Sequence, residues 1–119
     1  MNAIQETLSQ LHSSPGIKAA SVVTLDGLVA ADSLDARFRS DVIAGLASYL
    51  LMTTNKSLHE GGLADCEHLV LHATHGKVIL AALEDAYLVV VFDQFADMQE
   101  IRTSVDAAAS RIRTSSRIG

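Results

Sequence analysis

The chain has 119 residues, which is enough for one domain, and 49% of them are hydrophobic, which suffices for a continuous core. Aromatic residues make up only 4% and tryptophan is absent, so we expect an aliphatic core and no stacking platform for bases or sugars. The net charge of −5 argues against nucleic-acid binding, which depends on clustered Lys and Arg side chains.

The cysteine content and the hydropathy profile narrow the class further. Cys66 is the only cysteine, so no disulfide can form within the chain. No signal-peptide pattern opens the sequence. No apolar run is as long as the roughly 18 residues that a membrane-spanning helix needs. The one basic cluster, at Arg111, Arg113 and Arg117, is typical of a solvated helix end. We expect a single cytoplasmic domain over residues 1–119 without cofactor, metal, nucleic acid or membrane insertion.

The first predicted element is a short amphipathic helix over residues 2–12, with Asn2 as its cap. Residues 13–16 contain Pro15 and end it. Residues 17–25 and 28–32 then predict two strands. Between them, Asp26-Gly27 predicts a two-residue hairpin turn, because a type I′ turn needs positive φ angles.

Residues 38–60 predict a long helix, with Asp35 as a candidate cap and Gly61-Gly62 ending it by a left-handed turn. Its apolar side chains spread over roughly half of the circumference, whereas a surface helix needs a stripe of only about 100°. The side chains in this arc are Val42, Ile43, Leu46, Ala47, Tyr49, Leu50, Leu51 and Leu58. This surplus predicts a self-association face. The alternative is a central helix inside a larger core.

Three more strands are predicted over residues 65–73, 78–83 and 86–92, with turns at 74–77 and 84–85. The last two strands are apolar on both faces, so both faces of the sheet must be covered.

A final amphipathic helix starts at Asp97, which has capping-box spacing to Glu100, and ends near Thr114. The tail over residues 115–119 is expected to fray. The fold class is therefore α/β (α+β) in the order α-β-β-α-β-β-β-α. A five-stranded antiparallel sheet carries the long middle helix on one face and the two terminal helices on the other.

Several segments, in this order and at this length, resemble the Roadblock/dynein light chain family, whose fold is profilin-like and related to longin domains. They are Pro15-Gly16-Ile17, Asp26-Gly27-Leu28, Gly61-Gly62 and the segment LEDAYLVVV at 83–91. The single-domain form looks most like the MglB-like bacterial regulators of Ras-like GTPases. The chain itself has no GxxxxGK[ST] loop to bind phosphates.

The resemblance implies a homodimer in which the middle helices pair and the third strands join edge to edge. The residues then expected at the dimer interface are Val42, Leu46, Tyr49, Leu50, Thr53, His68, Val70 and His72. It also implies a platform for a Ras-like small GTPase. For this we expect a line on the polar side of the long helix, together with its start: Arg39, Ala44, Ser48, Met52 and Asn55. A plain solvent face with one exposed methionine is the alternative.

Catalysis and metal binding have weaker support. Cys66, His68 and His72 fall on one face of a predicted strand. Residues two positions apart on a strand are separated by about 6–7 Å, too far for Cys66 and His68 to act as a nucleophile and its base. His68 and His72 are farther apart still, too far to bind one zinc ion. A metal site or a pH-sensitive contact between subunits would need the same strand of a second subunit alongside. The preferred interpretation is that both histidines are solvated at the edge of the sheet. Arg37 and Arg39 are candidate arginine fingers toward a GTPase, although solvated charges are the preferred interpretation.

Three function classes follow from these observations. The first is a non-enzymatic homodimeric adaptor that binds a Ras-like small GTPase and modulates its hydrolysis. The second is a structural, light-chain-like adaptor that joins larger proteins without a GTPase. A small-molecule sensor is the weakest, because Val, Leu and Ile fill both sheet faces and leave no polar cluster to orient a ligand.

Overall fold

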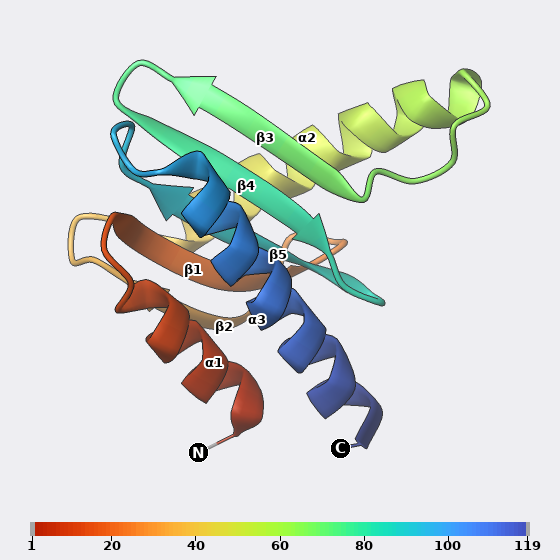
Figure 1. Ribbon diagram of the computed structural model, residues 1–119. Helices are drawn as coiled ribbons and strands as arrows, with labels where there is room; N and C mark the ends of the chain where they lie inside the picture. The colour runs from red at the N-terminus through yellow and green to blue at the C-terminus, as the bar shows by residue number, and fades with distance from the viewer. Residues whose placement is uncertain (1, 119) are drawn as a thin grey trace.

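The computed structural model describes the backbone of residues 2–118 and the side chains of residues 2–115. The elements are α1 Ala3–His12, β1 Ile17–Thr24, β2 Val29–Leu34, α2 Ser40–Glu60, β3 His68–Ala73, β4 Gly76–Ala82, β5 Ala86–Phe92 and α3 Met98–Ile118 (Figure 1). The predicted order of helices and strands is confirmed.

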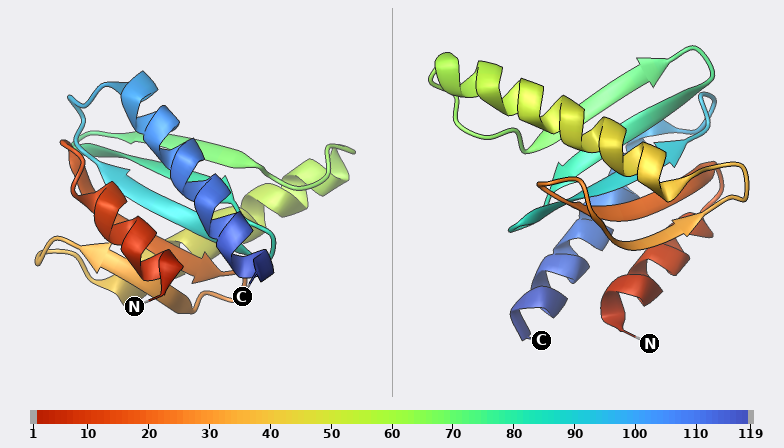
Figure 2. Two further views of the ribbon diagram at one scale, coloured as in Figure 1. Left: turned by 60° about the horizontal axis from the view of Figure 1, so that its bottom comes forward. Right: turned by 180° about the vertical axis from the view of Figure 1, so that it is seen from behind.

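The five strands form one antiparallel sheet in the order β2-β1-β5-β4-β3. The central strand is therefore β5, and β2 and β3 are the two edges. Helices α1 and α3 lie on one face of this sheet and α2 lies on the other (Figure 2). This is the predicted three-layer α+β architecture.

Alternation along β5 divides the interior into two cores. Leu88 and Val90 face α1 and α3 and pack in a cluster with Leu8, Val105 and other aliphatic side chains. Tyr87 and Val89 face the opposite way and pack with residues of α2. Because both faces of β5 are buried, the strand needs apolar side chains at every position, as its sequence shows.

The β1–β2 hairpin has a three-residue loop, so the predicted two-residue turn is wrong. The N–H of Gly27 donates to the carbonyl of Thr24 at 3.0 Å, and the N–H of Thr24 donates to the carbonyl of Leu28 at 2.9 Å. Gly27 has φ +89°, while Asp26 stays in the ordinary region. A type I turn followed by a left-handed glycine requires only one positive φ angle.

The ends of α2 also differ from the sequence prediction in detail. Its N-cap is Arg39, whose side chain makes no capping hydrogen bond, and Asp35 instead contacts His12 with 2.7 Å between carboxylate and ring nitrogen. At the other end Gly62 has φ +77° and the N–H of Leu63 donates to the carbonyl of Leu58 at 2.8 Å. This is a Schellman ending, in which Gly62 supplies the predicted left-handed residue.

Several other boundaries moved. β2 ends at Leu34 and not at residue 32, and β4 starts at Gly76 and not at residue 78, which shortens the turn predicted at 74–77. β3 starts at His68 and not at residue 65. In the segment before it, Cys66 is held by side chains of other elements, and the carbonyl of Glu67 accepts the N–H of Ala82 in β4 at 2.8 Å. Helix α3 continues to Ile118, beyond the predicted end near Thr114, since no glycine or proline interrupts it there. The last residue of the predicted frayed tail, Gly119, lies outside the described residues.

Candidate interaction surface

The outer face of α2 carries an exposed apolar stripe. Val42, Leu46 and Tyr49 are 57%, 53% and 62% exposed, respectively. At about 100° per residue they lie opposite Ala44 and Ala47, which are buried against the sheet. We call Val42, Leu46 and Tyr49 the outer stripe. The surplus apolar surface predicted from the sequence therefore faces away from this chain's own core, which excludes the larger-core alternative within one subunit.

Small side chains explain how α2 covers the sheet without burying the outer stripe. Ala44, Ala47 and Leu51 pack on Val23 and Val89 in the core on this side of the sheet. In Figure 2 α2 crosses this face with no other helix on top of it. One side of α2 therefore packs on the sheet, and the opposite side, which carries the outer stripe, stays exposed to a partner.

The remaining predicted interface residues lie on α2 and on the edge strand β3. Leu50 is half-buried against the core beneath α2, and Thr53 is exposed. On β3, Val70 packs partly on the opposite core, and His68 lies 3.4 Å from the carboxylate of Asp106.

His72, two residues beyond Val70, is exposed on the same strand. Within residues 2–118, β3 has only β4 as a neighbour, so the backbone groups on its outer side have no partner strand there.

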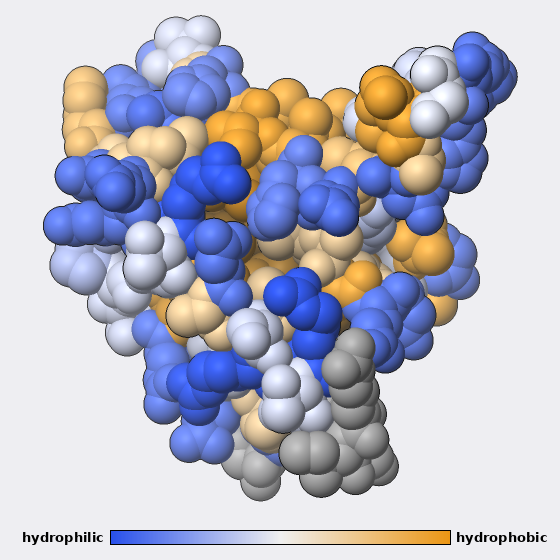
Figure 3. Space-filling view, turned by 45° about the vertical axis from the view of Figure 1, so that its right-hand side comes forward, coloured by the Kyte–Doolittle hydropathy of each residue, from blue (hydrophilic) through white to orange (hydrophobic). Residues whose placement is uncertain are grey.

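The hydrophobic surface and this free edge adjoin one another. Figure 3 shows hydrophobic residues gathered at the upper edge of the molecule, between the β3–β4 hairpin and the end of α2. Contiguous exposed apolar surface beside an unpaired strand edge is typical of a protein–protein interface.

The predicted GTPase-docking line is not one continuous surface. Ala44 is wrong, because it is 1% exposed and faces the sheet. Asn55 is half-buried and its side-chain oxygen accepts a hydrogen bond from the N–H of Cys66 at 2.7 Å. Ser48 is half-buried and donates to the carbonyl of Leu25 at 3.4 Å. Among Ala44, Ser48, Met52 and Asn55, only Met52 is exposed, at 65%.

Arg39, the remaining docking residue, is exposed and forms an ion pair with Asp41 at 3.0 Å. Arg37, the other candidate finger, holds its guanidinium 5.0 Å from the ring centroid of Phe38. Both side chains have local contacts, and both remain accessible to a partner.

The hairpin tip supplies two apolar residues that the sequence reasoning missed. Leu25 and Leu28 flank the Asp26-Gly27 pair and are 60% and 63% exposed. We call Leu25 and Leu28 the hairpin leucines. The tip rests on α2 at Ser48, one turn before Met52. Two leucines around a turn signal, where polar residues are usual, could have indicated this surface.

The surroundings of Cys66 favour a structural role. Its Sγ lies 3.3 Å from the carbonyl oxygen of His68, and its own carbonyl accepts a hydrogen bond from the Tyr87 hydroxyl at 2.9 Å. Burial raises the pKa of the Cys66 thiol above its ordinary value. A protonated, buried thiol is a poor nucleophile. Within residues 2–118, no three His, Cys, Asp or Glu side chains lie close enough to hold a metal ion.

The C-terminal arginines serve internal contacts. Arg111 donates to the side-chain oxygen of Gln10 at 2.7 Å, and Arg113 donates to the carbonyl of Ala82 at 2.8 Å. The side chain of Arg117 lies outside the described residues. The two described arginines thus tie α3 to α1 and to the end of β4.

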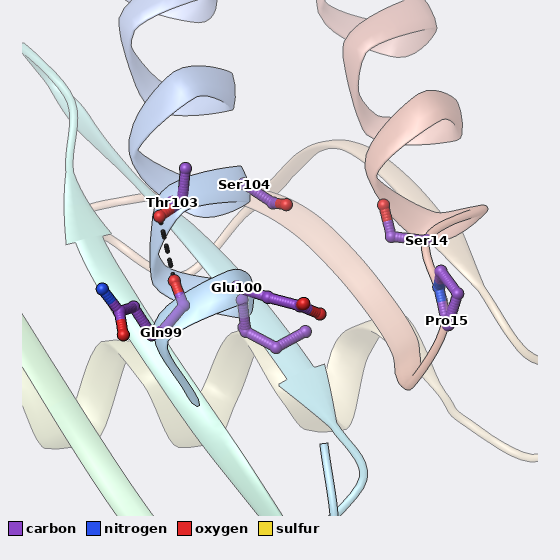
Figure 4. A pocket seen from close by; sticks show the side chains of 7 residues that line it. Ser14, Pro15, Gln99, Glu100, Thr103 and Ser104 are labelled. Atoms are coloured by element: carbon purple, nitrogen blue, oxygen red, sulfur yellow. Dashed lines mark hydrogen bonds between the residues drawn. The ribbon is translucent and has the colours of Figure 1, made fainter. Parts of the chain in front are cut away.

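A hollow of about 530 Å³ lies between the end of α1 and the first turns of α3. In Figure 4 Ser14 and Ser104 point into it from opposite sides, and Thr103 donates to the carbonyl of Gln99 at 2.9 Å. Glu100 is the only charged side chain among its lining residues, and neither histidine nor cysteine lines it. The hollow offers no base to activate a serine.

The model of the Roadblock/LC7 domain matches residues 3–92. The chain belongs to the Roadblock/LC7 domain family. Among curated relatives, the uncharacterised protein MJ0714 of Methanocaldococcus jannaschii is 28% identical over 110 residues, which cover 92% of this chain and 93% of the relative.

Two solved structures have the same fold as this chain. MglB of Myxococcus xanthus superimposes with a TM-score of 0.87 at 13% identity, over 93% of this chain and 92% of MglB. Profilin of Schizosaccharomyces pombe gives a TM-score of 0.66 at 18% identity, over 92% of this chain and 96% of profilin. The MglB-like and profilin-like fold predicted from the sequence is thereby confirmed. No helix in residues 2–118 is both long and apolar enough to cross a bilayer.

Proposed function

We propose that this chain is a non-enzymatic homodimeric adaptor that binds a Ras-like small GTPase and modulates its GTP hydrolysis. The observation that carries the proposal is the outer stripe, three large apolar side chains exposed on one line of α2. Membership of the Roadblock/LC7 domain family supports it, because the family resemblance implies both self-pairing and a GTPase partner.

The proposed dimer joins two outer stripes and two β3 edges. Pairing the helices removes Val42, Leu46 and Tyr49 from water. Full burial of an exposed Val or Leu contributes about 1.5–3 kcal/mol, and these partly covered side chains contribute a fraction of that each. Pairing of the β3 edges satisfies backbone N–H and C=O groups that are free in one subunit.

The proposed GTPase surface consists of the hairpin leucines, Met52 and Arg39. Leu25, Leu28 and Met52 are exposed apolar side chains at the junction of the hairpin tip with α2. Methionine adapts its shape to a partner, and leucines give non-directional contact. Ser48 holds the hairpin tip against α2, Asn55 bonds instead to Cys66 before β3, and Ala44 has no part in this surface.

The proposed action is binding and not catalysis. The sequence lacks a phosphate-binding loop, and the pKa of the one thiol is raised by burial. Any effect on GTP hydrolysis therefore acts through the loops of the GTPase or through a donated arginine, for which Arg37 and Arg39 are the accessible candidates.

Binding to purified Ras-like GTPases loaded with GDP or with a non-hydrolysable GTP analogue tests this function. We expect a preference for one nucleotide state, loss of binding in Leu28→Glu, and retained dimerisation in that variant. Single-turnover GTP hydrolysis with Arg37→Ala and Arg39→Ala then measures any arginine contribution. A dimer that binds neither nucleotide state of any such GTPase contradicts the GTPase proposal and favours the structural light-chain-like adaptor.

A further inference from the structure

A second surface lies at a corner of the sheet that α2 leaves uncovered. It is a pocket of about 470 Å³ between the start of β1, the segment before α2, the β3–β4 hairpin and the end of β5. Its apolar floor includes the half-buried Val78 and Val91. These side chains stay accessible because α2 begins only at Ser40 and runs away from this corner (Figure 2). We call this the corner pocket.

The corner pocket is lined mainly by positive charges, although the whole chain has a net negative charge. The sequence has 9 Lys and Arg residues against 14 acidic ones, yet Lys18, Arg37 and Lys77 all line this pocket, with His75 beside them. In the described part of the chain, none of the three cations has a carboxylate within ion-pair distance. Asp93 is the only acidic lining residue, and its carboxylate accepts the N–H of Phe95 at 2.7 Å.

The aromatic wall of the pocket positions one of these charges. The guanidinium of Arg37 lies 5.0 Å from the ring centroid of Phe38, which is within the range of a cation–π contact. This contact limits the conformations of Arg37 and leaves its N–H donors available, so less entropy is lost when an anion binds.

From this combination we propose that the corner pocket binds an acidic segment of a protein partner that places one apolar side chain on the floor. Charge complementarity selects the acidic flanks, and Val78 with Val91 takes the apolar residue. Each lysine, arginine and histidine that lines the pocket is at least partly exposed, whereas a pocket for a small ligand buries most of the ligand's surface.

This inference is tested separately from the GTPase proposal. The corner pocket shares no residue with the outer stripe or the hairpin leucines, and the pocket variants leave Arg37, the candidate arginine toward the GTPase, unchanged. A variant of the pocket can therefore lose its ligand while the chain still dimerises, and the two proposals can fail separately.

Amide NMR titration of the full chain tests the proposal. The probes are five peptides, Glu-Glu-X-Glu-Glu with X as Leu, Ile, Val, Met or Phe, and inorganic phosphate is titrated separately. We expect saturable shifts at Arg37, Gly76 and Lys77 with at least one peptide, and weaker binding at higher salt.

Matched variants separate charge recognition from loss of structure. Lys18→Gln with Lys77→Gln is expected to lower peptide affinity at least about tenfold while leaving the rest of the spectrum in place, and Lys56→Gln on α2 is expected to change nothing. The proposal is overturned if no peptide shifts these amides at concentrations up to about 5 mM, because a Kd above that concentration corresponds to negligible binding. It is also overturned if the double variant binds as tightly as the native chain, or if phosphate displaces the peptide from the same amides, which assigns the pocket to a small anion.

Discussion

Asn55 and Cys66 join α2 to the start of β3: the side-chain oxygen of Asn55 accepts the N–H of Cys66 at 2.7 Å. The carbonyl of Cys66 accepts the Tyr87 hydroxyl at 2.9 Å from the central strand. Both backbone polar groups of Cys66 are thus bonded by side chains from other elements. The irregular segment before β3 is thereby held in place beside the strand edge proposed for pairing.

Removal of the Asn55 side chain tests this anchor. Asn55→Ala leaves the N–H of Cys66 without its partner, so we expect the free energy of unfolding to fall by about 1–2 kcal/mol. Chemical denaturation measures the change. Lys56→Ala, at the next and exposed position, is the control and is expected to change stability by less than about 0.5 kcal/mol. Equal stabilities of the two variants would contradict a structural role for Asn55.

Two glycine substitutions are expected to have opposite effects. Gly27 has φ +89°, and an added methyl group there would also lie 3.4 Å from the side chain of Ser48. Gly27→Ala is therefore expected to lower stability by at least about 1 kcal/mol. Gly45 lies within α2, where an added methyl group meets no other segment within 4 Å, so Gly45→Ala is expected to raise stability by about 0.5–1 kcal/mol.

Thermal denaturation of the two alanine variants beside the native chain checks the sign of each change. A stabilising Gly27→Ala would show that the hairpin tip does not keep its left-handed glycine in solution.

The burial of Cys66 predicts a loss of stability at alkaline pH. Because the thiol pKa is raised in the folded chain, the thiol ionises first in the unfolded chain, near its ordinary value of 9.0. This contribution to stability is complete below about pH 9 and is lost as the pH rises through the folded pKa. Denaturation at several pH values should show a steeper alkaline decline for the native chain than for Cys66→Ala. Parallel curves for both proteins would refute the assignment.

Hydrophobic periodicity predicted most of the fold. The uninterrupted apolar run of β5 indicated a strand buried on both faces, and the apolar arc of α2 exceeded what one sheet face covers. The local caps at Asn2 and Asp97 were also correct, because a side-chain oxygen and the N–H two or three residues on lie close in sequence.

Features that depend on distant residues were not predictable in this way. Asp35 was a candidate cap by position, but His12 of α1 lies 2.7 Å from it and its carboxylate is used there. Ala44 was assigned to the polar line by spacing, yet its small size is what lets α2 approach the sheet. The corner pocket draws on β1, the hairpin and the residues before α2, so no sequence window contains it.

Sedimentation equilibrium of the native chain and of Leu46→Glu, with Leu28→Glu as a matched control, tests the central claim that the outer stripe joins two subunits. Leu46 and Leu28 are both exposed leucines, so neither change disturbs the core. At about 10 µM, well above the Kd expected for a stable dimer, we predict twice the 12.7 kDa chain mass for the native chain and Leu28→Glu, and the single mass for a folded Leu46→Glu. A native chain that sediments as a monomer, or a Leu46→Glu variant that remains a dimer, would contradict the account.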